Sequence, residues 1–237
     1  MNRREFIATG AAAGAVVAAG SLMGQAPAPT DKTPFKMKFA PHFGMFENLA
    51  GDDLIDQLKF AADEGFSAWE DNGMGGRPVD EQEKIAAAMV KLNITMGIFV
   101  ALAEFDADTF ASTDPANRER ILKAIKEGVE VAKRVNAKWF TVVPGQFDPG
   151  LEWDYQTAYV IDNLKYCAEI CEPVGVTMVL EPLNPWSDHP KLFLTKVSQA
   201  YQICRAVGSP SCKILDDLYH QQITEGNLIP NIDRAYS

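Results

Sequence analysis

From about residue 35 to the last residue, short apolar runs alternate with segments in which apolar residues recur at helical spacing. This alternation constrains the fold more than any other feature of the chain. A strand that is followed by a helix and then by another strand produces a parallel sheet with crossover helices. The sequence therefore predicts an α/β fold built from about six βα units.

The expected strands are short and rich in β-branched residues, at 35–40, 67–70, 94–102, 138–143, 176–180 and from 212. The expected helices carry apolar residues every three or four positions. They are a helix capped by Asp52 and Asp53 and closed at Gly65, then 79–92, 112–135, 154–174, 193–207 and a short helix from about 227.

Two kinds of parallel sheet fit this order of elements. An open, doubly wound sheet usually carries a glycine fingerprint for phosphate after its first strand, and none follows residues 35–40. The glycines of 73–76 follow the second strand and lack the spacing of the fingerprint, so we interpret them as a loop. We expect a (β/α)8 TIM barrel, truncated after about six of its eight units.

Acidic residues follow the fifth and sixth expected strands. Glu181 comes directly after the apolar run and is followed by Pro182, which ends the strand because it has no N–H to donate. Asp217 follows the next strand, and His220 comes three residues later. Because ligands gather at the carboxyl ends of parallel strands, we expect these three side chains to meet there. The alternatives are a solvated loop acid at Glu181 and a helix-capping or surface histidine at His220.

Carboxylates beside an imidazole suit one divalent cation, Mn²⁺ or Mg²⁺ in the first place and Zn²⁺ or Co²⁺ as alternatives.

The formal net charge of −10 argues against a nucleic-acid partner, because phosphate binding depends on clustered Lys and Arg. The cysteines have no zinc-site spacing, so we interpret them as small buried side chains: Cys167, Cys171, Cys204 and Cys212.

The first 28 residues resemble a twin-arginine export signal. Arg3 and Arg4 precede a weakly hydrophobic run rich in Ala and Gly, and 26–28 provides a small-residue cleavage site. A transmembrane anchor is the alternative, although the run is poorly hydrophobic for that role. We therefore expect a signal peptide at 1–28, a linker at 29–34, one domain at 35–237, and a periplasmic or exported protein that uses the twin-arginine export machinery.

The motif E-P-L-N at 181–184, the motif D-x-x-H-x-Q at 217–222 and G-N-L at 226–228 resemble, in this order, the hydroxypyruvate isomerase branch of the xylose isomerase-like TIM barrel superfamily. The resemblance implies that Glu181 binds the metal and moves a proton, that Asp217 is the second ligand, and that His220 touches a substrate oxygen. It also implies a third ligand on strand seven and a second catalytic glutamate on strand eight, for which the sequence has no counterpart.

This resemblance favours an isomerase of small sugars or hydroxy-acids that works through a metal-stabilised enediolate. Its alternatives are a sugar epimerase of the same superfamily and an exported carbohydrate-binding barrel without catalysis. A metal-dependent endonuclease is disfavoured by the acidic charge.

His42 and Glu70 lie at other strand ends and Trp186 in a loop, where they could line the substrate pocket, and packing or solvation is the alternative for each. A homo-oligomer is left open. We do not expect residues 29–237 alone to form a stable, active monomer, because the first and sixth strands would be exposed edges.

The export signal can be tested directly. Replacing Arg3 and Arg4 by Lys should leave the precursor in the cytoplasm, because the paired arginines are the recognised feature of the signal. Cell fractionation with an antibody against the protein measures the result. Normal export and cleavage of the doubly substituted protein would contradict the assignment.

Overall fold

The computed structural model describes residues 35–236. All of these residues belong to the second of the two units into which the chain divides, Lys32–Ser237, and the expected signal peptide and linker lie outside the described residues. Among the residues that are described, no helix is both long enough and apolar enough to cross a bilayer.

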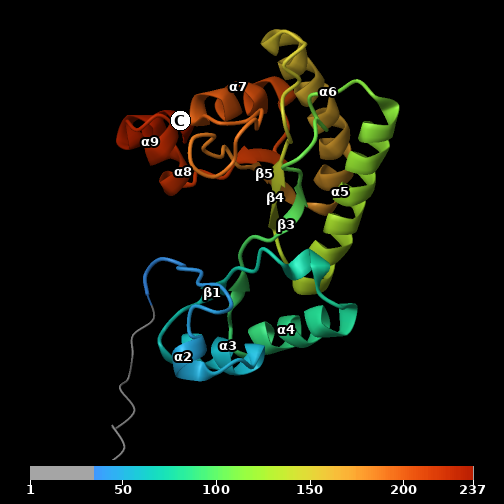
Figure 1. The fold of residues 1–237 in the computed structure, drawn as a ribbon. Coiled ribbons are helices and arrows are strands. Elements are labelled where there is room, and N and C mark those ends of the chain that lie inside the picture. Colours follow the sequence, from blue (N-terminus) through green and yellow to red (C-terminus); the bar gives the residue numbers. More distant parts are fainter. Residues whose placement is uncertain (1–34, 237) are drawn as a thin grey trace, which may run out of the picture. The chain divides into compact units, whose positions relative to one another are not determined.

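Short parallel strands form the centre of the second unit (Figure 1). One sheet has the order β1-β2 and the other has the order β3-β4-β5-β6. The strands are β1 (Ala68–Trp69), β2 (Thr95–Met96), β3 (Val100–Ala103), β4 (Trp139–Val143), β5 (Thr177–Leu180) and β6 (Cys212–Ile214). Neighbours in each sheet are consecutive in the sequence, as the expected barrel order requires.

The two sheets are joined through the residues between β2 and β3. The amide of Gly97 donates to the carbonyl of Trp69 at 2.7 Å, and the amide of Thr141 donates to the carbonyl of Phe99 at 2.8 Å. One extended segment, 95–103, therefore pairs with β1 through its first half and with β4 through its second half. This segment corresponds to the single strand expected at 94–102.

Helices connect the strands, and successive helices pack against one another: α4 contacts α5, α5 contacts α6, and α6 contacts α7 (Figure 1). The helices and 3-10 turns are α2 (Glu47–Ala50), α3 (Leu54–Asp63), η1 (Met74–Gly76), α4 (Val79–Lys91), α5 (Pro115–Val135), α6 (Trp153–Cys171), η2 (Glu172–Val174), α7 (Val197–Val207), α8 (Leu218–Thr224) and α9 (Leu228–Ala235). The expected TIM barrel architecture is confirmed for these units.

Side-chain caps fix where two of these helices begin. Asp53 accepts hydrogen bonds from the amides of Ile55 and Asp56 at 2.8 and 3.1 Å, and α3 starts beside it. Asp114 accepts from the amide of Ala116 at 2.9 Å ahead of the proline that opens α5. Both starts were expected from the sequence.

The core lies between the sheets and the helices. Large aromatic side chains are fully buried there, and Phe99 and Phe140 meet edge to face with ring centroids 5.8 Å apart. Burial of one such ring stabilises the fold by about 1.5–3 kcal/mol. Helix α5 approaches β3 closely at Gly128, where an added Cβ would lie 2.7 Å from the Cβ of Ala101.

The prediction of a strand at 35–40 is wrong. This segment is irregular, and Phe35, Met37 and Phe39 are 45, 68 and 49% exposed. No residue of 35–40 pairs in a strand, and the parallel bridge between His42 and Glu70 comes after the segment. Within the described residues the segment has one adjacent strand, so few ladder hydrogen bonds offset the conformational entropy lost on ordering it.

The start of one helix also differs from expectation. Helix α7 starts at Val197 rather than at Phe193, because the amide of Phe193 donates to Gly145 at 2.9 Å and the amide of Leu183 donates to Leu194 at 3.2 Å. These bonds hold residues 193–194 outside the helix. The short helices α2 and α8 were not predicted.

Gly145, just after β4, is a test of the packing at the end of the sheet. Its φ is +90°, and an added Cβ would lie 2.6 Å from Oγ1 of Thr109 and 2.7 Å from the carbonyl of Ala107. We expect Gly145→Ala to lower the free energy of unfolding by about 3 kcal/mol, because strain and a steric clash add together.

Gly175 is the matched control, since its φ is +67° but an added Cβ would meet nothing within 4 Å. Gly175→Ala should cost only about 1 kcal/mol, for the left-handed backbone alone. Urea unfolding of the two variants measures both values. Equal losses would contradict the close contact at Gly145.

Candidate active site

Glu181 and Asp217 are placed by two adjacent parallel strands. Strand β5 pairs with β6 in the register Leu180 to Ile214, and Glu181 follows the last paired residue of β5. The chain continues from β6 through residues 215–216 to Asp217, where α8 begins. Both acids therefore lie at the carboxyl ends of neighbouring strands, where the sequence placed them.

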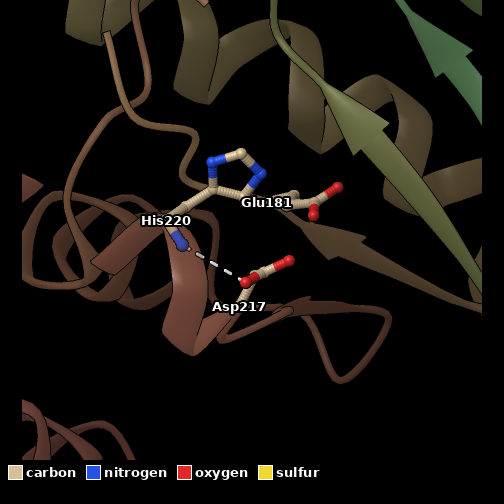
Figure 2. A group of neighbouring side chains, drawn as sticks. All are labelled: Glu181, Asp217 and His220. Carbon is tan, nitrogen blue, oxygen red and sulfur yellow. Dashed lines mark hydrogen bonds between the residues drawn. The ribbon is translucent and has the colours of Figure 1, made fainter. Parts of the chain in front are cut away.

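His220 completes a cluster with these acids (Figure 2). One ligand atom from each of Glu181, Asp217 and His220 lies within 4.8 Å of the others. Carboxylate oxygens and an imidazole at this separation are donors that a hard or borderline divalent cation accepts. The two carboxylates therefore fit one divalent cation, as expected from the sequence, and the imidazole lies beside them.

Asp217 also caps a helix. Its Oδ1 accepts a hydrogen bond from the amide of His220 at 3.3 Å (Figure 2) and another from the amide of Tyr219 at 2.8 Å. These bonds satisfy two free N–H groups at the start of α8. The cap holds the carboxylate in place and leaves Oδ2 for a ligand. It also explains why α8 starts at this residue, and why His220 lies one turn into the helix on the same side as Glu181.

Burial and neighbouring charge change the proton affinity of the acids. Burial raises the pKa of Glu181 to about 7, and the carboxylates of Asp217 and Glu70 add to the rise. Burial also raises the pKa of Glu70, and Asp217 adds to this effect while His42 opposes it. Such mutual effects require the groups to be near one another, so Glu70 and His42 share the electrostatic environment of the cluster.

The sequence-predicted residues therefore divide into two groups. Glu181, Asp217 and His220 form the cluster. Glu70 interacts electrostatically with Asp217 of the cluster, and His42 is paired with Glu70 through a backbone bridge and through charge. The remaining residue predicted to line the pocket, Trp186, is 75% exposed in the loop after β5.

Sequence reasoning missed a role for Asn184. This residue is fully buried, and its backbone amide and side-chain nitrogen lie 3.3 and 2.8 Å from Nδ1 of His220. The signal for it was its place in the E-P-L-N motif. Nothing in the spacing of that motif indicates a contact with a residue 36 positions later.

Comparison with protein families gives one match over most of the domain. The family described as xylose isomerase-like TIM barrel matches residues 58–236, which includes every member of the cluster.

Curated relatives of this chain carry isomerase names. A 2-oxo-tetronate isomerase of Pectobacterium atrosepticum is 27% identical over 195 residues, which cover 81% of this chain and 71% of that protein. The hydroxypyruvate isomerase of Escherichia coli is 27% identical over 114 residues, which cover 48% of this chain and 44% of that protein. Across the relatives with the strongest matches, the aligned part spans from 44 to 74% of their length.

Solved structures share the fold. The 3-keto-D-glucoside 4-epimerase YcjR of E. coli superposes with a TM-score of 0.67 at 19% identity, covering 85% of this chain and 76% of that one. The IOLI protein, solved with a zinc atom, superposes with a TM-score of 0.64 at 20% identity, covering 83% of this chain and 69% of that one. These structures establish the fold and no more.

The raised pKa of Glu181 predicts how stability depends on pH. In the metal-free protein the carboxyl is protonated below its unfolded pKa, near 4.5, and must ionise at a buried position as the pH passes about 7. Its contribution to stability is therefore complete at low pH and is lost as the pH rises. Glu181→Gln keeps a neutral group at every pH, so the variant should gain on wild type between pH 5 and 8, by on the order of 3 kcal/mol.

Urea unfolding in the presence of a chelator measures this difference. Wild type and variant share every other titrating group, so the change in their difference with pH reports the ionisation of Glu181 and its effect on the neighbouring acids. A difference that stays constant from pH 5 to 8 would show that Glu181 ionises as a solvated acid.

Proposed function

This chain belongs to the xylose isomerase-like TIM barrel family, and on that premise we propose that it is a metal-dependent isomerase of small hydroxy-carbonyl or sugar substrates. The observation that carries the proposal is the cluster of Glu181, Asp217 and His220 at the carboxyl ends of β5 and β6. The names of the hydroxypyruvate and 2-oxo-tetronate isomerases among its relatives support the same reaction class.

Glu181 is the proposed acid–base residue. Moving a carbonyl group to the neighbouring carbon requires removal of a proton beside it and return of that proton to the adjacent carbon. A carboxyl group with a pKa of about 7 is suited to both steps, because it accepts and releases protons with similar ease near neutral pH. The partial burial that raises this pKa also limits the access of bulk water to the proton.

Asp217 and Glu181 are the proposed metal ligands. A bound divalent cation would supply positive charge where negative charge develops on the substrate oxygens. Asp217 is suited to this role because its cap on α8 fixes one oxygen and leaves the other for a ligand. His220 is placed to donate a hydrogen bond to a substrate oxygen. We propose Mn²⁺ or Mg²⁺ as the cation, and the zinc atom in the IOLI protein keeps Zn²⁺ open as an alternative.

A sugar epimerase of the same superfamily is the second candidate. Epimerisation exchanges a proton on opposite faces of one carbon and so requires two acid–base groups. Glu70 is a second acid whose raised pKa responds to the charge of Asp217, which favours this alternative. A solved structure with the same fold is named as an epimerase.

We also propose a periplasmic location for this reaction. Export by the twin-arginine route, which rests on Arg3 and Arg4, would place the reaction in the periplasm and its substrate among small sugars or hydroxy-acids there.

Calorimetric titration with Mn²⁺ tests the metal site. Wild type should bind one equivalent, and Asp217→Ala and Glu181→Gln should each lose most of the affinity, because each removes a charged ligand. Asp162→Ala is the control, since it removes an exposed acid in the middle of α6. Equal affinity in wild type and in both site variants would reject the site.

Hydrogen exchange on the substrate tests catalysis separately. With Mn²⁺ and hydroxypyruvate in D₂O, proton NMR should show deuterium entering the carbon beside the carbonyl. Glu181→Gln should slow this exchange by about 10²–10⁴-fold. Metal and sugar binding by wild type without any exchange would identify a binding protein instead of an isomerase.

A further inference from the structure

Two donors on Asn184 converge on one nitrogen of His220. The backbone amide of Asn184 donates to Nδ1 at 3.3 Å, and its side-chain nitrogen lies 2.8 Å from the same atom. A backbone amide is always a donor, so its partner must accept. Asn184 is fully buried and His220 is 9% exposed, so protein groups surround most of this contact.

The orientation of the Asn184 side chain is fixed by its other partners. Its Oδ1 accepts from the amide of Ser187 at 2.9 Å, and its Nδ2 donates to Oδ2 of Asp188 at 2.7 Å. Oδ2 of Asp188 also accepts from the hydroxyl of Tyr219 at 2.9 Å. Rotating the amide by half a turn would set its oxygen against a carboxylate and its nitrogen against an N–H. The nitrogen that faces His220 is therefore a donor as well.

We propose that Asn184 is a positioning residue that holds His220 as the tautomer with its hydrogen on Nε2. In a neutral imidazole one nitrogen donates and the other accepts, and here Nδ1 is the acceptor. Figure 2 shows the His220 ring turned so that one nitrogen points toward Glu181. Because Nδ1 is engaged by Asn184, the nitrogen left for the cluster is Nε2.

This tautomer determines what His220 contributes to the cluster. A nitrogen that carries a hydrogen has no lone pair for a metal, and histidines that bind metals donate their other nitrogen to an oxygen acceptor instead of receiving hydrogen bonds there. His220 therefore offers a hydrogen bond, while Glu181 and Asp217 offer the ligand oxygens. This step rests on the proposed function: the Nε2 hydrogen of His220 is the one donated to a substrate oxygen.

Nitrogen NMR of ¹⁵N-histidine-labelled wild-type protein tests the tautomer without metal or substrate. The chain has three histidines, so spectra of His42→Gln and His189→Gln assign the signals by elimination. At neutral pH the directly attached hydrogen of His220 should be found on Nε2, and Nδ1 should give the signal of an unprotonated acceptor. A hydrogen on Nδ1 would overturn the proposal.

A reciprocal exchange tests the part played by Asn184. The double variant Asn184→Asp with Asp188→Asn keeps one amide and one carboxylate in contact, and the amide nitrogen now at position 188 can reach both former partners of Oδ2. It places a carboxylate oxygen against Nδ1, and a charge-assisted bond there favours the hydrogen on Nδ1. We expect the tautomer to switch in this variant, and Zn²⁺ to bind about tenfold more tightly as Nε2 becomes a ligand.

The control is Asn163→Asp, which alters another buried asparagine, on α6, whose partners are Arg118, Phe110 and Ser112. It should leave the His220 signals unchanged. A folded double variant with the wild-type tautomer would contradict the role of the Asn184 side chain, because the backbone amide at 184 would then hold the tautomer alone. If the double variant does not fold, the wild-type spectrum still decides the tautomer. A protein that shows the expected tautomer but neither binds Mn²⁺ nor exchanges substrate hydrogens would refute the proposed function alone.

Discussion

The parallel pairing of β5 with β6 is the constraint on which the site depends. It aligns Leu180 with Ile214, and in parallel strands both chains then leave the sheet at the same edge. Glu181 is the first residue after β5, and Asp217 is the third residue after β6. Burial disfavours the charged form of Glu181, and the neighbouring carboxylates repel it, so its pKa rises to about 7. A bound cation would be favourable there because it would neutralise this negative charge. The fold thus creates an electrostatic cost that a divalent cation would relieve.

Much of this arrangement could be predicted from the sequence because it depends on local patterns. Strand β5 ends where Pro182 removes an amide donor, α3 and α5 begin at aspartate caps, and the order of the strands follows from alternation with helices. The closeness of Glu181 and Asp217 then follows from the rule that consecutive parallel strands are neighbours. None of these inferences requires knowledge of a contact between distant side chains.

What could not be predicted depends on such contacts. Residues 35–40 alternate as a strand should, yet they have one adjacent strand among the described residues and remain irregular. The start of α7 is delayed because Phe193 pairs with Gly145, 48 positions earlier. Asn184 reaches His220 across a gap of 36 residues, and its several hydrogen bonds become apparent only when β5 and α8 are in place. Periodicity identifies elements, but it does not show which polar groups meet when they pack.

The central claim is that Glu181 and Asp217 together hold one divalent cation at the end of β5 and β6. Anomalous X-ray diffraction from crystals grown with Mn²⁺ tests it most directly, because the method locates the ion itself. The account predicts one anomalous peak within about 2.0–2.6 Å of a carboxylate oxygen from each residue, with Nε2 of His220 outside bonding distance of it. A well-ordered site without a peak, or a peak held by other residues, would contradict the account.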